Sequence, residues 1–321
     1  MDEQVAAAYR RFADVEARGV SEIYFRWAEA IADDPEVTNL IGQLPGIKRQ
    51  PNLVFAAARH LGAPEGPYDP FRSWLLSNWS TVTAVVQTRS TQTNEAARCA
   101  VLLPILSRLD GDLALIEAGA SAGLALYPDR YSYRYDDEGA ITELDPDDGR
   151  SRVVITCTID SGSVPSRLPN IAWRAGVDLN PIDAQDPEQL NWLETLVWPE
   201  HDERRQRLHD AATIAAADPS HLVHDDLLEK IPELINDAPT GAHVVVFHSA
   251  VLNYLPLDKR ETFVELVSSF PSVTWISNEG PGVIPTVSSQ VDAEVGERAI
   301  LAVNGRPVAL TGPHGQSYLA L

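Results

Sequence analysis

Cysteine and lysine are scarce in this chain of 321 residues. It contains two cysteines, Cys99 and Cys157, and three lysines, Lys48, Lys230 and Lys259. Two thiols are too few for a disulfide framework or for a metal site built from thiolates alone. No apolar run reaches the roughly 18 residues that a membrane-spanning helix requires, and the acidic start of the chain does not resemble a signal peptide. We therefore expect a soluble, cytoplasmic protein without a membrane partner.

Positive charge is also in short supply. The chain has 25 Lys and Arg residues against 46 Asp and Glu residues, which gives a formal net charge of −21. Nucleic acids attract basic surfaces, so this balance excludes nucleic acid as the main partner. Hydrophobic residues make up 44% and charged residues 22%, as in globular chains that bury a sizeable core. The composition therefore predicts a folded protein.

The first third of the sequence has a helical pattern. Apolar residues recur at steps of three and four, as in Ile23 and Trp27. Asp34-Pro35 and Gln50-Pro51 have the features of helix starts, because proline at the first helical position has no N–H that could lack a partner. No convincing alternating strand pattern is present. We therefore expect residues 1–110 to form a helical N-terminal cap.

The pattern changes after residue 110. Short apolar runs bounded by turn residues alternate with helical stretches, which is typical of a parallel sheet covered by helices on both faces. Residues 131–160 instead alternate with period two and favour an inserted hairpin. Asn304-Gly305 lies between apolar flanks and favours a C-terminal hairpin. We therefore expect an α/β domain with a mostly parallel sheet over residues 111–321.

The segment after the first expected strand is the most informative part of the sequence. An apolar run ends at Glu117 and is followed by the turn residues Gly119, Ser121 and Gly123, and then by the expected start of a helix. Small residues let a ligand approach the backbone, and the unpaired N–H groups of a helix start attract carboxylates and phosphates. Glu-x-Gly-x-Ser-x-Gly is close to the Glu-x-Gly-x-Gly-x-Gly turn of S-adenosylmethionine-dependent methyltransferases. The pattern thus indicates cofactor binding at this turn.

The same residues permit two other interpretations. Gly-x-Ser-x-Gly is also the pattern around the nucleophile of serine hydrolases, with Ser121 as nucleophile and His314 as the histidine. Asp225, Asp226 or Glu279 would then be the acid, in the right chain order. A hydrolase sheet places several strands before its nucleophile, whereas here a helical region precedes it, so the hydrolase is the alternative hypothesis. A tight turn without a ligand is the other interpretation.

Acids and a histidine follow the later expected strands. Asp178 ends one strand and is the residue type that binds the two hydroxyls of a ribose. Asp225 and Asp226 follow another strand, where an acid can contact adenine, and His248 ends the strand that would face the reacting group. These strand ends share the carboxyl edge of a parallel sheet, where ligands bind in open α/β folds. Asp136 is a second candidate for the ribose, because its sequence distance from the turn is nearer to the usual one.

Eight strings of residues carry a family resemblance. They are Arg49-Gln50-Pro51-Asn52, Thr91-Gln92-Thr93-Asn94-Glu95, residues 117–126, Asp129-Arg130-Tyr131, residues 176–183, Val197-Trp198-Pro199-Glu200, Phe247-His248 and Pro313-His314-Gly315. Together they resemble the uncharacterised family called domain of unknown function 2332, which looks similar to class I S-adenosylmethionine-dependent methyltransferases. The resemblance implies a Rossmann-like methyltransferase fold over residues 111–321 with a helical N-terminal cap, and it names no substrate. Ser121 stands where the general methyltransferase turn has glycine, as the resemblance implies for the whole family, and Ala125 stands where the family pattern implies asparagine.

Methyl transfer to a small-molecule acceptor is the function that these observations favour. The expected cofactor-binding residues are Glu117, Gly119, Ser121, Gly123, Asp178, Asp225, Asp226 and His248, and the residues expected on the acceptor side are His248, Tyr254, Glu279 and His314. No metal is expected, because His221 and His224 lack the helix spacing of a zinc site. The alternatives are a protein that binds S-adenosylmethionine without transferring its methyl group, and a hydrolase that uses Ser121. The acceptor and the oligomeric state are left open.

Overall fold

The computed structural model describes residues 2–92 and 94–321. The chain divides into two compact units, Met1–Thr93 with Asp186–Gln206, and Asn94–Gln185 with Arg207–Leu321. This division differs from a boundary at residue 110 in two ways. The helix α6 (Cys99–Leu106) belongs to the second unit, and the segment Asp186–Gln206, here called the returning segment, joins the helices of the first unit.

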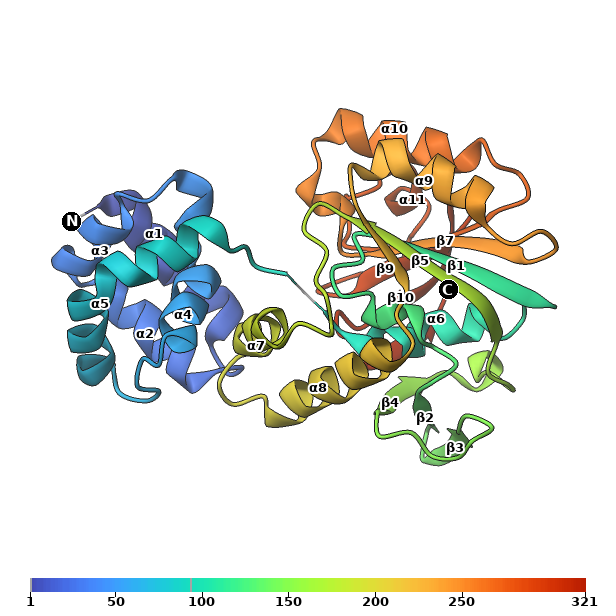
Figure 1. Cartoon of the computed structure of the whole chain (residues 1–321), viewed down its shortest axis with the longest axis horizontal. Helices are drawn as coiled ribbons and strands as arrows, with labels where there is room; N and C mark the ends of the chain where they lie inside the picture. The colour runs from blue at the N-terminus through green and yellow to red at the C-terminus, as the bar shows by residue number, and fades with distance from the viewer. Residues whose placement is uncertain (1, 93) are drawn as a thin grey trace. The chain divides into compact units, whose positions relative to one another are not determined.

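The first unit is helical, as the sequence predicted. Its elements are α1 (Glu3–Phe12), the π-helical turn η1 (Ala13–Ala17), α2 (Glu22–Ala32), α3 (Pro35–Ile41), η2 (Gly46–Lys48), α4 (Pro51–His60), α5 (Tyr68–Thr88) and α7 (Pro187–Leu196). Figure 1 draws α1 to α5 in blue to cyan and α7 in yellow-green. Pro35 and Pro51 begin α3 and α4, and Asp34 caps α3. The core of this unit is aromatic, and the rings of Trp27 and Phe71 are stacked within it.

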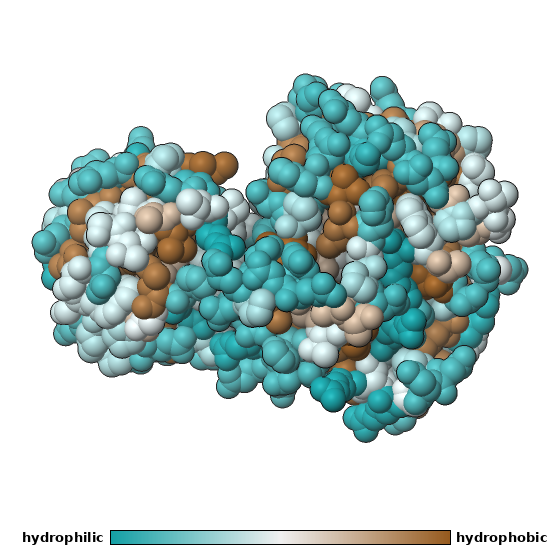
Figure 2. Space-filling view, in the orientation of Figure 1, coloured by the Kyte–Doolittle hydropathy of each residue, from teal (hydrophilic) through white to brown (hydrophobic). Residues whose placement is uncertain are grey.

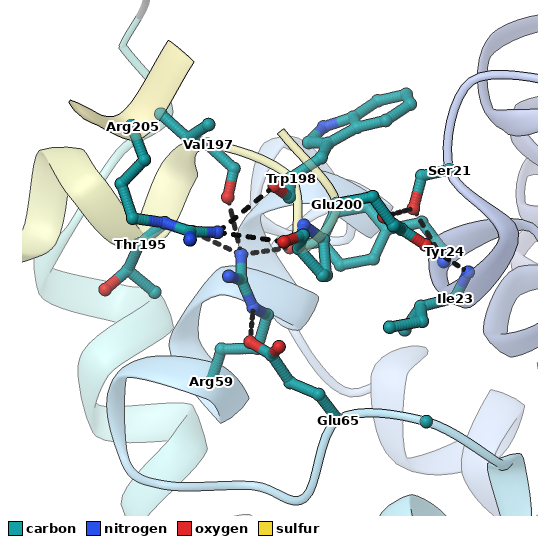
Figure 3. A network of polar contacts seen from close by, with 12 residues as sticks. Ser21, Ile23, Tyr24, Arg59, Glu65, Thr195, Val197, Trp198, Glu200 and Arg205 are labelled. Atoms are coloured by element: carbon teal, nitrogen blue, oxygen red, sulfur yellow. Dashed lines mark hydrogen bonds and ion pairs between the residues drawn. The ribbon is translucent and has the colours of Figure 1, made fainter. Parts of the chain in front are cut away.

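A buried arginine attaches the returning segment to these helices (Figure 3). Arg59 Nη1 donates hydrogen bonds to the carbonyl oxygens of Thr195 and Val197, each at 2.7 Å. Glu200 accepts a hydrogen bond from Ser21 Oγ at 2.6 Å, next to the N-terminus of α2. These contacts explain how a segment that is distant in sequence completes the first unit.

The second unit contains a sheet of eleven strands, mostly parallel. Five parallel strands stand in the order β6 (His221–His224), β5 (Asn170–Asp178), β1 (Asp112–Ala118), β7 (His243–Ser249) and β8 (Thr274–Glu279). The order continues from β8 through β9 (Ala299–Val303), β10 (Arg306–Thr311), β11 (Ser317–Ala320), β4 (Val154–Ile159), β2 (Ser132–Asp137) and β3 (Ala140–Leu144). The mostly parallel α/β sheet is therefore confirmed.

The expected C-terminal hairpin is present, because Asn304-Gly305 connects the antiparallel strands β9 and β10. The hairpin expected within residues 131–160 is present only in part: β2 and β3 form an antiparallel pair, whereas the second alternating run, with Ile155 and Cys157, lies on β4 and pairs in parallel with β2. The second hairpin is not a separate insertion, because β2 pairs with β4 and β4 pairs with β11. The hairpin therefore extends the main sheet.

Helices cover both faces of this sheet. The helices α9 (Leu227–Asp237), α10 (Leu257–Ser268) and α11 (Pro285–Ser288) lie on one face, and α6 lies on the opposite side (Figure 1). Ile231 of α9 and Phe263 of α10 pack in one core with Ile116 and Val246 of the central strands. The helix α8 (Asp202–Ala217) precedes β6 and contains the point where the chain returns to the second unit. This packing fixes the central strands and the loops at their ends.

The strand order reverses between β1 and β7. From β1 the chain adds β5 and then β6 on one side, and β7 and then β8 on the other. Loops at the carboxyl ends of β1 and β7 consequently lead away from each other to opposite faces, and a crevice at such a point is the usual ligand site of an open α/β sheet. The carboxyl ends of β1 and β7 thus mark where a functional site is to be sought.

The surface carries little continuous apolar area on the face drawn in Figure 2, where hydrophobic residues occur in small scattered groups. Among the described residues, none of the helices combines the length and the apolar character needed to cross a membrane.

Candidate functional site

The turn after β1 has an unusual backbone. Gly119, Ser121 and Gly123 all have positive φ, at 73°, 49° and 67°. Such angles suit glycine and are sparsely populated by serine. The prediction of a helix after this turn is wrong, because the short 3₁₀ turn η4 (Leu124–Leu126) follows it. A ligand here cannot rely on the N-terminus of a long helix, so side chains must supply its polar contacts.

Side chains from two other segments hold the turn in place. Asn94 Nδ2 donates to Ser121 Oγ at 2.6 Å, and Asn94 Oδ1 accepts the N–H of Ala122 at 2.9 Å. Asp178 Oδ2 accepts the N–H of Ser121 at 2.8 Å. Asn94 and Ser121 are buried. The Ser121 hydroxyl is therefore paired with an amide, which is not a base that could activate it.

Asp178 lies beside the turn, as a cofactor-binding acid should. Its other oxygen, Oδ1, accepts the N–H of Asn180 at 2.7 Å, so both carboxylate oxygens already bind backbone groups. A ribose hydroxyl would use the remaining lone pairs of these oxygens. Asp136 lies on β2, near the opposite end of the strand order, where it accepts the N–H of Gly139. Of the two ribose candidates, only Asp178 is at the turn.

The two neighbouring acids after β6 have different positions. The N–H of Asp225 donates to the carbonyl oxygen of Asp178 at 3.2 Å, which places Asp225 next to the loop that follows β5. Asp226 is the N-cap of α9, and its Oδ1 accepts the N–H of Leu228 at 2.8 Å. Asp225 therefore belongs to the edge of the site, whereas Asp226 has a capping role in the helix.

A buried carboxyl group stands at the end of β1. The Glu117 side chain is 8% exposed, and its Oε2 is buried without a hydrogen-bond partner. Burial raises the pKa of Glu117 well above its ordinary value, against the lowering effect of the nearby Arg98, and Asp178 raises it further. A buried carboxyl oxygen without a partner is energetically unfavourable, so this group is suited to a ligand that brings a donor.

Arg98 was not singled out by the sequence. It ends η3 (Ala96–Arg98), where Nη1 donates to the carbonyl oxygen of Ser249 at 2.9 Å and Nε donates to that of Pro313 at 3.2 Å. Ser249 ends β7, so Arg98 reaches the point where the strand order reverses. A lone arginine in a helical stretch carries no sequence signal for such a role. Its position becomes apparent only from the long-range contacts.

His248 and Glu279 form a buried pair at the ends of β7 and β8. His248 Nδ1 lies 2.7 Å from Glu279 Oε1, and the indole N–H of Trp275 donates to His248 Nε2 at 3.1 Å. Burial by itself would raise the pKa of Glu279, but hydrogen bonds from His248 and from the N–H groups of Val251 and Leu252 hold it below its usual value. His248 is completely buried with both ring nitrogens in use, so it does not present a free nitrogen to a substrate.

Tyr254 and His314 occupy loops at the same edge of the sheet. Tyr254 ends η6 (Leu252–Tyr254), after β7, and is 75% exposed. His314 is exposed in the turn between β10 and β11. That turn packs closely on η3, because a Cβ at Gly315 would overlap the carbonyl group of Ala97. Both side chains are thus accessible to a second reactant at the carboxyl edge.

The comparison with known families agrees with the residue strings given above. The model of a family described as "Uncharacterized protein conserved in bacteria (DUF2332)" matches residues 6–318. The chain belongs to this family. No curated protein and no solved structure matches it. The DUF2332 match covers segments of both units.

The residue strings that carried the resemblance meet in two places. In the first unit, the indole N–H of Trp198 donates to Asn52 Oδ1 at 3.0 Å, which joins the returning segment to α4. In the second unit, Asn94 contacts the 117–126 turn, and the turn around His314 packs on η3. The first group has a structural role, whereas the second surrounds the candidate site.

A cavity of about 270 Å³ borders the turn on the side of β5 and β6. Its lining includes Ala122, Tyr127, Pro181, Ile182, Ser220 and Leu222. Its walls combine apolar side chains with polar ones, which include Asp183 and Gln185.

Metal chemistry finds no support in the ligand types of this site. Within residues 2–92 and 94–321, no group of three or more His, Cys, Asp or Glu side chains is arranged to hold a metal ion. Cys99 and Cys157 are buried free thiols, and burial raises the pKa of Cys157 to about 12. These thiols are poor nucleophiles at neutral pH.

Proposed function

We propose that this DUF2332 protein is an S-adenosylmethionine-dependent methyltransferase that acts on a small-molecule acceptor. One observation carries the proposal: the buried carboxyl group of Glu117 and the guanidinium of Arg98 lie close together where β1 and β7 diverge. The amino-acid end of S-adenosylmethionine offers an ammonium and a carboxylate group. Glu117 Oε2 can accept from the ammonium, and the Arg98 guanidinium complements the carboxylate. A Rossmann-like methyltransferase fold is in keeping with the order of the five parallel strands.

The adenosine part finds suitable groups on the other side of the turn. Asp178 has lone pairs left for the ribose hydroxyls, and Asp225 lies next to it. Gly119, Ser121 and Gly123 let the cofactor approach the backbone closely. The cavity beside Ala122 offers apolar side chains for a flat ring.

S-adenosylmethionine supplies an electrophilic methyl group, so the protein needs to align the reactants and exclude water more than it needs an acid. Arg98 and Glu117 orient one end of the cofactor. Tyr254 and His314 are the accessible side chains that can contact the acceptor. His248 and Glu279 are engaged with each other and support the site from behind.

The hydrolase alternative gains no specific support. This alternative pairs the nucleophile Ser121 with His314, and a serine nucleophile requires its histidine within hydrogen-bonding reach. The buried Ser121 Oγ instead accepts a hydrogen bond from Asn94 Nδ2 at 2.6 Å. A protein that binds the cofactor without transferring its methyl group would use the same residues as the transferase, so only turnover separates these two.

Calorimetric titration with S-adenosylhomocysteine tests the proposal. We expect micromolar binding by the wild-type protein and its loss in Glu117→Ala and in Arg98→Ala. Arg108→Ala is the matched control, because Arg108 also donates to a backbone carbonyl, that of Gly162, but outside the site. Absence of binding by the wild-type protein would contradict the proposal. Formation of S-adenosylhomocysteine from S-adenosylmethionine in the presence of a small-molecule cell extract then separates a transferase from a binding protein.

A further inference from the structure

A buried hydrogen-bond chain lies behind the candidate site. It runs from the indole N–H of Trp275 to His248 Nε2 at 3.1 Å and from His248 Nδ1 to Glu279 Oε1 at 2.7 Å. The Trp275 contact requires Nε2 to be an acceptor, so the ring proton is on Nδ1 and points to Glu279. A neutral histidine is the side chain that offers one donor and one acceptor at these two positions. In both hydrogen bonds the donor is therefore on the side of Trp275 and the acceptor on the side of Glu279.

Glu279 connects this chain to the loop that follows β7. Its Oε1 also accepts the N–H groups of Val251 and Leu252, at 2.9 Å and 3.1 Å. The pKa of Glu279 is lowered despite burial, which favours the carboxylate form as the acceptor of all three hydrogen bonds. Val251 and Leu252 are thereby attached to β8 through one carboxylate oxygen, whereas Ser249 and Ala250 make separate hydrogen bonds to Asn278 of the same strand.

The same loop contacts the turn after β1. A Cβ built on Gly119 would lie 2.5 Å from Val251 Cγ2, so the Val251 side chain rests directly on the Gly119 backbone. Ala250, immediately before it, has a φ of 55°, a conformation that L-residues adopt rarely. This backbone requires support from its surroundings. The N–H of Ala250 donates to the carbonyl oxygen of Asn278 at 3.0 Å, and Glu279 holds the two amides that follow.

We propose that His248 is a positioning residue, which holds the loop of residues 249–254 against Gly119 through Glu279 and so forms one wall of the cofactor site. The cofactor in this statement rests on the proposed function, whereas the attachment of the loop does not. Without the His248 donor, Glu279 is left as a buried carboxylate with one fewer partner, and its hold on Val251 and Leu252 weakens. The loop then opens and the wall beside Gly119 is lost.

Hydrogen exchange of the Val251 and Leu252 amides tests the attachment without any ligand. In His248→Leu we expect these two amides to exchange about tenfold faster or more, as for an opening that loses one charge-assisted hydrogen bond. His248→Asn retains a donor near the Nδ1 position and should restore much of the protection, and it also serves as the test if His248→Leu fails to fold. Unchanged exchange in a folded His248→Leu protein, or no rescue by asparagine, would overturn the proposal.

His243→Leu is the matched control. His243 begins the same strand, and its Nε2 lies 2.7 Å from Thr274 Oγ1 on β8, but at the opposite end of β7 from the loop. We expect it to lower stability without affecting the exchange of Val251 and Leu252. Equal acceleration in His243→Leu would show general loosening of the sheet and would refute a specific role for His248.

Titration with S-adenosylhomocysteine then connects the loop to the site. We expect His248→Leu to bind about tenfold more weakly than the wild type, and His248→Asn and His243→Leu to bind nearly as well. If the wild type binds no S-adenosylhomocysteine, the proposed function fails, while the exchange data still decide whether His248 positions the loop. If binding is unchanged although the loop opens, the loop is not a wall of the cofactor site and this inference fails alone.

Discussion

Asn94 Nδ2 donates a hydrogen bond to Ser121 Oγ at 2.6 Å. Asn94 Oδ1 accepts the N–H of the following residue, Ala122, at 2.9 Å. Ser121 has a φ of 49°, which costs an L-residue roughly 1–2 kcal/mol. The two hydrogen bonds offset this cost. Asn94 thus stabilises this conformation of the turn that follows β1.

Asn94→Ala should therefore loosen the turn. We expect the free energy of unfolding to fall by about 1–3 kcal/mol, because two buried polar groups lose their partner. Binding of S-adenosylhomocysteine should weaken about tenfold, since the turn no longer keeps its conformation. Urea denaturation and calorimetric titration measure the two effects.

Asn52→Ala is a suitable comparison for this change. Asn52 Oδ1 accepts the indole N–H of Trp198 in the first unit, so its removal also costs a side-chain hydrogen bond. We expect a similar loss of stability with little loss of affinity. If both variants lose affinity equally, Asn94 has no special role at the turn.

Gly119→Ala tests the contact between the turn and the loop after β7. Its added Cβ would lie 2.5 Å from Val251 Cγ2, whereas a Cβ at Gly111, which has a similar φ of 77°, would meet no atom within 4 Å. Both substitutions carry the cost of a left-handed alanine, about 1–2 kcal/mol. We expect only Gly119→Ala to abolish ligand binding. Equal binding by the two variants, measured by calorimetry, would argue against close packing of Val251 on the turn.

Arg59 should be essential for docking of the returning segment. Its Nη1 donates to the carbonyl oxygens of Thr195 and Val197, and its side chain is buried. A lysine cannot reproduce this fork, so Arg59→Lys should lower the free energy of unfolding by about 2–3 kcal/mol and speed proteolysis within residues 186–206. Arg26→Lys, at an exposed ion pair with Glu22, should change neither. Slow cleavage in Arg59→Lys would contradict the role assigned to Arg59.

Local sequence patterns were sufficient for much of the fold. Proline at helix starts located α3 and α4, and Asn304-Gly305 located the hairpin of β9 and β10, because each signal acts over a few residues. Period-two alternation located β2 and β4 but not their parallel pairing. The helix predicted after Gly123 does not form, because residues further along the chain contact this segment. The carbonyl oxygens of Leu124 and Leu126 accept hydrogen bonds from the Tyr131 hydroxyl and the Arg174 guanidinium, and helical N–H groups do not reach them. Pro128 further restricts the chain at this point.

The residues of the candidate site could likewise be predicted from the sequence only in part. Glu117 and Asp178 could be selected from the sequence because each follows a strand that ends at one edge of the sheet. Asn94 and Arg98 precede β1 in the chain and reach the site only through contacts with Ser121 and Ser249. His248 also matched its expected strand end, but its pairing with Trp275 and Glu279 depends on the two strands β7 and β8 being adjacent. No pattern within one strand contains that information.

Two buried glutamates at the carboxyl edge should respond to pH with opposite sign. The pKa of Glu117 is raised by burial, so the folded state holds its proton more tightly than the unfolded state does, and stability falls as pH rises between the two pKa values. The pKa of Glu279 is lowered, so its contribution is present above the unfolded pKa and is lost as pH falls. Glu117→Gln should therefore gain stability relative to wild type, by on the order of 1 kcal/mol, as the pH rises from acid to neutral. Glu279→Gln should be less stable than wild type at neutral pH, with a gap that narrows in acid. Urea denaturation across this range measures both differences, and parallel curves for Glu117→Gln and wild type would show that Glu117 is not a costly buried carboxylate. If Glu117→Gln gains stability but loses S-adenosylhomocysteine binding, the Glu117 carboxyl group lowers the stability of the fold and is needed to bind the ligand.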